Sequence, residues 1–141
     1  MADAAQSKAR HGLLLLEPDH YQRLLHEIGL DAADTMLAAM AERLQAAIGD
    51  DAVAARFSEH SLAVLMRGTD YAQTTALAER IREAFSSHVF QIGNRSSVIT
   101  ASIGGVQIGE KIASVSQVLA KANQGVQSSI GVGGNRFEIF D

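Results

Sequence analysis

The sequence is most informative at first for what it lacks. It contains no cysteine and no tryptophan, and it has one proline, Pro18, in 141 residues. Without cysteine there is no disulfide framework, no thiolate metal site and no cysteine nucleophile. No uninterrupted apolar run comes near the roughly 20 residues that cross a membrane. With a single proline, no proline-rich linker divides the chain. A length of 141 residues also suits one domain.

Charge is also sparse and balanced. The chain has 12 Lys and Arg against 16 Asp and Glu, which gives a net charge of -4. No basic stripe is present, so we expect no nucleic-acid partner. Residues 1–11 are polar and alanine-rich and lack the apolar core of a signal peptide. We interpret them as a linker, place the domain at residues 12–141, and expect a cytoplasmic protein with no membrane partner.

Hydrophobic periodicity predicts alternating strands and helices. The predicted strands are residues 12–16, 52–57, 61–66, 88–92, 97–106 and 136–140. The predicted helices are residues 20–28 and 31–48, with Asp19 and Asp31 as N-caps, residues 71–86 after Asp70, and a last helix after Ser114. Turns are predicted at 58–60 and 93–95, and a loop at 131–134. Because a hairpin interrupts the strand–helix alternation, we expect an α/β (α+β) fold with a mixed central sheet surrounded by helices.

Four segments along this pattern carry a family resemblance. They are EPDHY at 17–21, GLDAADTML at 29–37, ARFSEHSLAV at 55–64 and TASIGG at 100–105. They resemble, in order and at matching spacing, the segments DxDxF, GHxxGDxxL, ARYGGDEFAV and TxSIG of the GGDEF domain. The resemblance runs from about Leu13 to Phe140 and implies the nucleotidyl-cyclase-like fold of diguanylate cyclases.

That family joins two GTP molecules into cyclic di-GMP, and each of two domains holds one GTP. The resemblance implies carboxylates at the end of the first strand and in the hairpin that hold divalent metal against the triphosphate. It also implies two hairpin glycines that let the backbone approach the nucleotide. The chemistry is mostly positioning and charge neutralisation, so lost metal ligands are hard to replace.

The sequence departs from the family at these positions. Glu17 stands in place of the metal-binding aspartate, and Pro18 retains only the backbone carbonyl that the family uses. The glycines and acids of the hairpin are replaced by Ser58, Glu59, His60 and Ser61. A Glu59 carboxylate where the backbone should approach phosphate is both repulsive and obstructive.

The base and phosphate positions are also altered. The family asparagine of the first helix corresponds to Leu25, and the phosphate-neutralising lysine of the last helix to Ile130. Asp34 remains where the family uses an aspartate against the guanine edge, and Asp19 remains within the first segment. In the family, an RxxD motif just before the hairpin binds inhibitory cyclic di-GMP. Residues 47–52 stand at that place and contain no arginine, so the inhibitory cyclic di-GMP site is predicted absent. We predict no catalytic residue, no metal and no cofactor.

Three other interpretations stay open. Glu17, Glu59 and His60 offer oxygen and imidazole ligands for a remodelled metal site, although we favour ordinary turn residues. Glu17 and Asp34 also motivate a domain that binds GTP as an effector without converting it. An active cyclase with altered ligands is the least favoured hypothesis.

The leading hypothesis is a degenerate GGDEF domain that acts as a regulatory or interaction module. Similar domains sit beside an EAL domain in one chain, where they support dimerisation, transmit a signal from a sensor, or bind GTP. The expected partners are therefore other domains of the same chain, a second copy, and weakly bound GTP. By analogy alone, control of motility through type IV pili is the physiological expectation.

Overall fold

The computed structural model describes residues 11–50, 52–92, 95–108 and 114–140, and all structural statements below refer to these residues. The strands are β1 (His11–Pro18), β2 (Ala52–Ser58), β3 (Ser61–Arg67), β4 (Val89–Ile92), β5 (Arg95–Val98), β6 (Ala101–Ile108) and β7 (Arg136–Phe140). The helices are α2 (Tyr21–Ile48), α3 (Tyr71–Ser86) and α4 (Val115–Gly131). None of these helices is long and apolar enough to cross a membrane.

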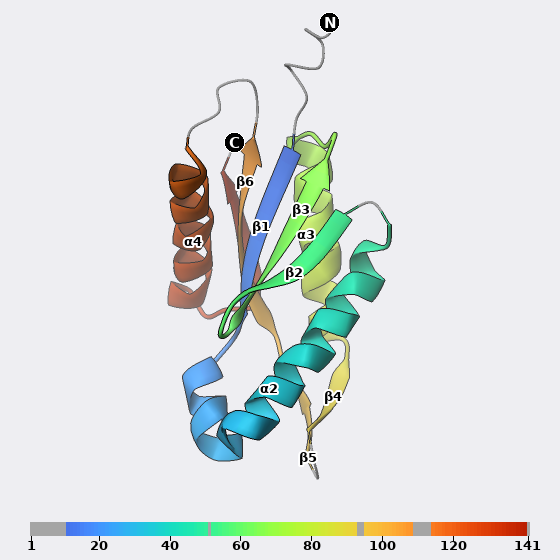
Figure 1. Cartoon of the computed structure of the whole chain (residues 1–141), viewed down its shortest axis with the longest axis vertical. Helices are drawn as coiled ribbons and strands as arrows, with labels where there is room; N and C mark the ends of the chain where they lie inside the picture. The colour runs from blue at the N-terminus through green and yellow to red at the C-terminus, as the bar shows by residue number, and fades with distance from the viewer. Residues whose placement is uncertain (1–10, 51, 93–94, 109–113, 141) are drawn as a thin grey trace, which may run out of the picture.

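Five strands form one mixed sheet in the order β2-β3-β1-β6-β7, and β4 and β5 form a separate hairpin. The central strand β1 runs antiparallel to both β3 and β6, while β6 and β7 are parallel. Helix α4 makes the crossover between the parallel strands and lies on one face of the sheet, and α2 and α3 lie on the other (Figure 1). The predicted mixed sheet with an inserted hairpin is confirmed.

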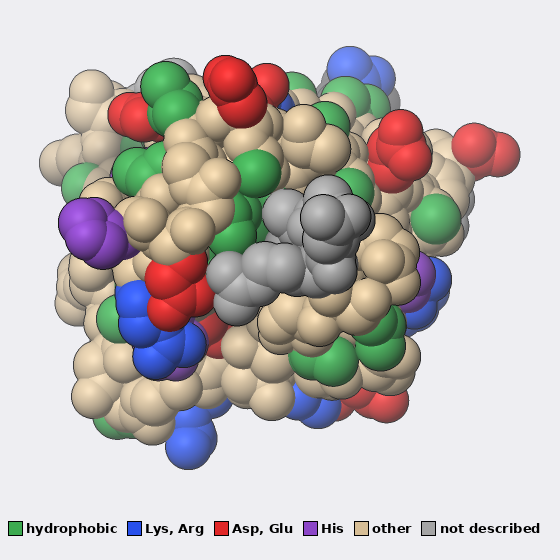
Figure 2. Space-filling model, turned by 90° about the horizontal axis from the view of Figure 1, so that it is seen from below, with side chains coloured by type: hydrophobic (Ala, Val, Ile, Leu, Met, Phe, Trp, Pro, Cys, Tyr) green, Lys and Arg blue, Asp and Glu red, His purple; other side chains and the backbone are tan. Residues whose placement is uncertain are grey.

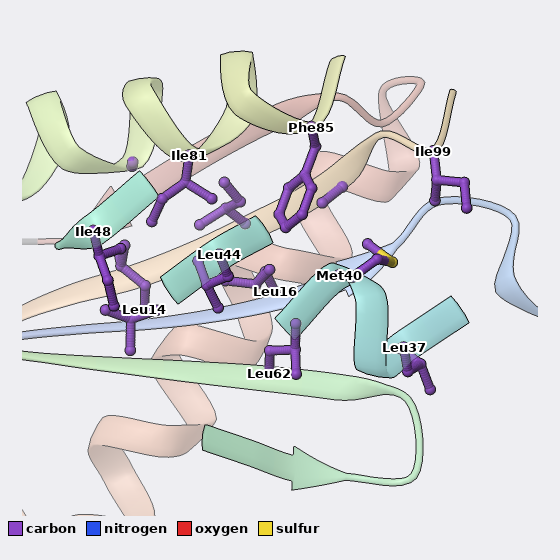
Figure 3. Packing of buried hydrophobic residues seen from close by; sticks show 14 of the residues in the cluster. Leu14, Leu16, Leu37, Met40, Leu44, Ile48, Leu62, Ile81, Phe85 and Ile99 are labelled. Carbon is purple, nitrogen blue, oxygen red and sulfur yellow. The ribbon is translucent and has the colours of Figure 1, made fainter. Parts of the chain in front are cut away.

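The central strand is buried on both faces, which explains its continuous apolar run. Leu14 and Leu16 face α2 and α3 in the main core, whereas Leu15 packs with Ala122 and Val126 of α4. Figure 3 shows Leu14 and Leu16 among side chains from both helices. The main core also contains large, fully buried side chains: Met36, Leu37, Met40, Leu44, Ile48, Leu62, Met66, Ile81, Phe85 and Ile103.

The two predicted first helices are joined in one element that kinks at Gly29 (φ 86°, ψ 169°). Both predicted N-caps of these helices are wrong. The cap position of α2 is His20, and Asp19 is instead buried under other contacts. Asp31 lies inside the helical segment, because Gly29 is the residue with non-helical angles. The caps Asp70 and Ser114 are confirmed, since each accepts from the backbone N–H three residues later in a capping box.

The single strand predicted at 97–106 is also wrong. The chain forms β5 up to Val98 and begins β6 at Ala101, in two different sheets. Thr100 causes the break, because its carbonyl accepts from the Asp19 N–H (2.9 Å) and its hydroxyl donates to the Asp19 carboxylate (2.6 Å). Of the predicted turn at 93–95, residues 93 and 94 lie outside the described residues, and Arg95 belongs to β5.

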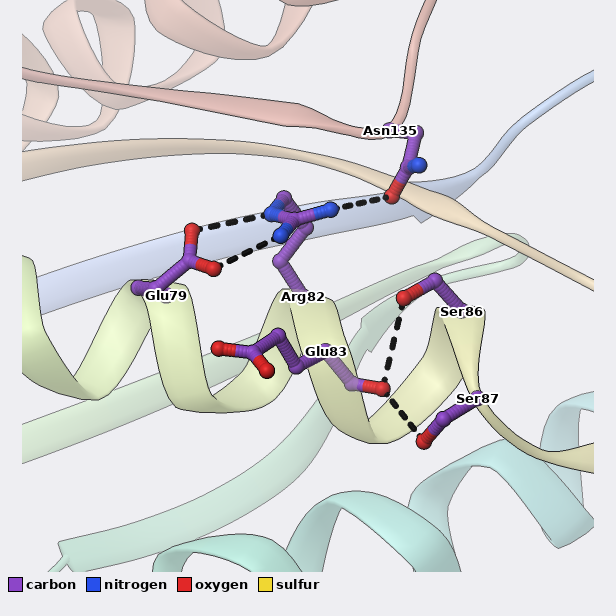
Figure 4. Close-up of polar contacts among 6 residues, drawn as sticks. All are labelled: Glu79, Arg82, Glu83, Ser86, Ser87 and Asn135. Atoms are coloured by element: carbon purple, nitrogen blue, oxygen red, sulfur yellow. Dashed lines mark hydrogen bonds and ion pairs between the residues drawn. The ribbon is translucent and has the colours of Figure 1, made fainter.

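An arginine on α3 connects this helix to the turn before β7. Arg82 donates to both carboxylate oxygens of Glu79, at 2.9 and 2.6 Å, and to Asn135 Oδ1 at 3.2 Å (Figure 4). The hydrogen bond from Arg82 lowers the pKa of the Glu79 carboxyl below its ordinary value. The same pair raises the pKa of Arg82, so both groups are charged at neutral pH.

Candidate functional site: the hairpin cleft

The end of β1, the start of α2 and the β2–β3 hairpin meet at one place, and this hairpin holds the segment that resembles the family's signature motif. His60, in the hairpin turn, stacks on the ring of Tyr21 with centroids 4.9 Å apart and planes at 16°. Its Nε2 lies 3.4 Å from Oε1 of Glu17. The imidazole therefore occupies the space beside the carboxylate that replaces the family's metal ligand.

Tyr21 reaches this position because His20 turns the chain sharply between β1 and α2. The backbone of His20 is left-handed (φ 60°, ψ 33°), and Tyr21 beyond it is 6% exposed. Burial raises the pKa of the Tyr21 phenol, and the negative charge of Glu59 raises it further. The phenol is thus a neutral group at physiological pH, and its ring serves as the platform for His60.

An arginine side chain also reaches this place from β2, and the sequence analysis did not identify it. Arg56 Nη1 lies 2.9 Å from Asp34 Oδ1, and its Nη2 donates to the Glu59 carbonyl at 2.8 Å. Arg56 pairs with Leu62 across the hairpin, on the sheet face that α2 covers. The strand alternation around Ala54 would have predicted that face, but not the partner on the distant helix.

Two serine hydroxyls join the strands at the two sides of the hairpin turn. The Ser58 and Ser61 hydroxyls lie 2.5 Å apart, and Ser61 is 6% exposed. The register shifts between Arg56 and Ser58, so a bulge bends the strand just before the turn. Serine side chains therefore fill the positions at which the family's glycine and acid would face a nucleotide.

The remaining predicted positions are not part of this cluster. Pro18 is buried in the sheet opposite Ala101, and Leu25 is partly buried against the main core. Ile130 is exposed near the end of α4.

Asp19 has a structural set of partners. It is 7% exposed and accepts hydrogen bonds from the Thr100 hydroxyl (2.6 Å), the Ser102 hydroxyl (2.6 Å) and the Asn135 N–H (2.8 Å). These donors come from the start of β6 and from the turn before β7. Asp19 thus joins three segments that are distant in sequence, and three donors engage most of the roughly four acceptor positions of its carboxylate.

A groove of about 440 Å³ runs between the hairpin and α4. Its lining residues are Leu15, Glu17, Phe57, Ser58, Ser61, Ser116, Leu119, Ala120, Asn123 and Val126. The lining holds one carboxylate and no cation, which does not suit a triphosphate. Figure 2 shows the end of the molecule at which α2 begins, where acidic, basic and histidine side chains alternate without a field of single sign.

The family's divalent cation does not fit these residues. Among the described residues no group of three His, Asp or Glu side chains could hold a metal ion. The Glu17 carboxylate already lies beside His60, and the Asp34 carboxylate beside Arg56. A metal would therefore have to displace contacts that the protein makes internally.

Comparison with known proteins places the chain in a family. The model of the family described as "Diguanylate cyclase, GGDEF domain" matches residues 1–136. The structure resembles the FimX GGDEF domain from Pseudomonas aeruginosa, with a TM-score of 0.89, 26% identity and coverage of 99% of this chain and 85% of that one. It also resembles an EAL/GGDEF domain protein from M. capsulatus, with a TM-score of 0.84, 25% identity, and coverage of 94% and 85%.

Two relatives match by sequence. Cyclic di-GMP phosphodiesterase NbdA from Pseudomonas aeruginosa is 25% identical over 91% of this chain. The matched region covers 16% of the length of that protein. Diguanylate cyclase A from Treponema denticola is 22% identical over 96% of this chain, which spans 37% of that protein. The fold and the hairpin define a nucleotidyl-cyclase-like domain. The chain belongs to the GGDEF family of cyclic di-GMP signalling.

Proposed function

We propose that this GGDEF domain is catalytically inactive and acts as a regulatory or interaction module in cyclic di-GMP signalling. The proposal rests mainly on His60, which stacks on Tyr21 beside Glu17 in the cleft where a cyclase would place metal and phosphate. The hairpin that defines the family is thus used to close its own site.

Electrostatics support the same conclusion. Phosphoryl chemistry needs cations around the triphosphate, and it is mostly positioning and charge neutralisation. Here the exposed Glu59 adds a negative charge at the turn, and Arg56 is engaged by Asp34. The side chains at Leu25 and Ile130 are apolar, so neither replaces the hydrogen bonds or the charge that the family has there.

The direct test is a turnover assay with GTP and either Mg²⁺ or Mn²⁺, with product detected by chromatography and mass spectrometry. We expect no cyclic di-GMP, while an active diguanylate cyclase assayed in parallel produces it. Product that this chain forms and that Glu17→Ala abolishes, in a variant with unchanged thermal unfolding, would overturn the proposal.

A second candidate is a GTP-binding effector without turnover, and Asp34 favours it. Its side chain is 68% exposed, so it could exchange Arg56 for the guanine edge. An NMR titration with GTP and Mg²⁺ separates the candidates. Shifts that cluster on Glu17, Asp34 and residues 58–61, and that Asp34→Ala weakens, support an effector site. No shift at millimolar GTP means that the domain serves as a scaffold.

The wider context is also proposed. We infer an EAL domain in the same protein, because one structural relative is named as an EAL/GGDEF domain protein and one sequence relative as a phosphodiesterase. A cytoplasmic location, an upstream sensor domain and a role in type IV pilus motility extend this proposal by analogy. A gene that encodes no EAL sequence beside this domain would contradict the inferred arrangement.

A further inference from the structure

Strand β2 forms one edge of the sheet. Strand β2 is the terminal strand in the order β2-β3-β1-β6-β7, so among the described strands it pairs only with β3. An edge strand of this kind presents a row of backbone donors and acceptors to a further strand. Arg56 is the one charged residue in the strand, and Asp34 and the Glu59 carbonyl already hold its guanidinium.

The side chains of this edge that point to the α4 face of the sheet are apolar and exposed. Val53 is 69% exposed, Phe57 49%, and Leu65 on the neighbouring strand 45%. Val53 pairs with Leu65 across the hairpin, and Ala55 with Ala63, which faces the α4 side. An exposed apolar patch next to an unpaired backbone edge is typical of an interaction surface.

The opposite edge of the same sheet is protected. Strand β7 alternates charged residues, Arg136 and Glu138, along one face. Lys121 of α4 lies over the ring of Phe140, 4.9 Å from its centroid. Charged side chains along an edge discourage pairing with another chain. The two edges therefore differ, and the difference favours pairing at β2.

We propose that β2 is a dimerisation edge, where a second copy of this chain pairs antiparallel about a two-fold axis at Ala55. This register places Val53 beside the partner's Phe57 and Arg56 opposite the partner's Ala54. A two-fold axis at Arg56 would instead set two guanidinium groups against each other, and like charges directly opposite destabilise a strand pair. The strand is thus complementary to itself in the register that pairs its exposed apolar side chains, Val53 with the partner's Phe57.

The expected dimer is weak and has a defined geometry. A contact of one short strand per copy is smaller than the roughly 1,200–2,000 Å² of a stable interface, so the association depends on concentration. Antiparallel pairing sends the two 58–61 hairpins to opposite ends of the joined sheet. Two clefts that lie at opposite ends cannot hold two GTP molecules against each other. The role of this dimer is therefore structural, and its formation does not depend on a nucleotide in the cleft.

The test uses the 141-residue chain in sedimentation velocity over micromolar to millimolar concentrations, without nucleotide. We expect the mass to rise from 15.0 kDa toward that of a dimer. The exposed Ala55 is changed to lysine in one variant and to glutamate in another. Like charges meet at the axis in each, so we expect about a tenfold or larger weakening of the dimer.

Mixing the Ala55→Lys and Ala55→Glu chains pairs opposite charges and should restore the dimer, which also shows that both variants are folded. The matched control is Ala38→Lys, an exposed alanine of α2, which should dimerise like the original chain. A monomer at every concentration would overturn the proposal and point to a different partner at β2. A dimer that Ala55→Lys and Ala55→Glu leave unchanged would overturn it as well.

Discussion

Gly104 fixes how closely α4 approaches the sheet, and Gly104→Ala tests this packing. A Cβ at Gly104 would lie 1.9 Å from the Ala122 carbonyl oxygen and 2.3 Å from the Val126 N–H nitrogen. Ordinary contact begins at 3.4 Å, so α4 would have to move away from β6 by about 1.5 Å. Both obstacles are helix backbone, which cannot rotate aside as a side chain can.

The cost can be estimated from what this movement separates. Ala122 and Val126 are buried against Leu15, and a gap of about 0.5–1 Å already removes a quarter to a half of the dispersion attraction between facing atoms. Overpacked cores lose about 1–3 kcal/mol, and occasionally more. Because the clash here is with backbone, we expect Gly104→Ala to lower the free energy of unfolding by about 3 kcal/mol or more.

Urea unfolding followed by circular dichroism measures this loss. Gly131→Ala, at the end of the same helix, is the control, because a Cβ there meets nothing within 4 Å. We expect that control to be neutral or to stabilise by about 0.4–1 kcal/mol, since it reduces the entropy of the unfolded chain. A Gly104→Ala variant that lost less than about 1 kcal/mol would refute the estimate, because it would fall at or below the bottom of the range for overpacking.

Two further predictions concern buried and surface charge. Asp19→Asn should lower the free energy of unfolding by about 2 kcal/mol, because hydrogen bonds to a charged acceptor contribute about 1.5–3 kcal/mol; the exposed Asp31→Asn should stay within about 0.5 kcal/mol in the same urea assay. The lowered pKa of Glu79 means that its pair with Arg82 stabilises the fold above the ordinary glutamate pKa, and that this contribution is lost as pH falls through the lowered value. Since Glu79 is 40% exposed, screening limits the effect to about 0.5 kcal/mol. Melting curves of the original chain and Glu79→Gln should therefore differ slightly at pH 7 and converge in acid; equal curves throughout would show that the pair contributes nothing.

The elements that were predicted well carry local signals. Leu14 and Leu16 lie in a continuous apolar run, which is typical of a strand that is buried on both faces. Asp70 and Ser114 sit three residues before a glutamine, which is the pattern of a capping box. The signature hairpin was also located by its motif, although its conformation was not.

The errors arose where distant residues decide a local conformation. The strand at 97–106 looks continuous in sequence, but it is divided because Thr100 bonds to Asp19, 81 residues away. Asp19 looks like a cap, yet three donors, from Thr100, from Ser102 of β6 and from the turn before β7, hold it inside the protein. Its partners outweigh a single cap hydrogen bond, since each is a hydrogen bond to a buried carboxylate.

The sequence by itself determined the family, the order of strands and helices apart from the division at Thr100, and the replacement of the hairpin signature by Ser58, Glu59, His60 and Ser61. These are properties of residue type and spacing, and they can be read along the chain. Only the tertiary structure decided how the new residues are used. His60 stacks on Tyr21, and Arg56 reaches Asp34, because folding brings the hairpin against the start of α2. Such contacts depend on distances between segments far apart in the chain, which neither periodicity nor composition specifies.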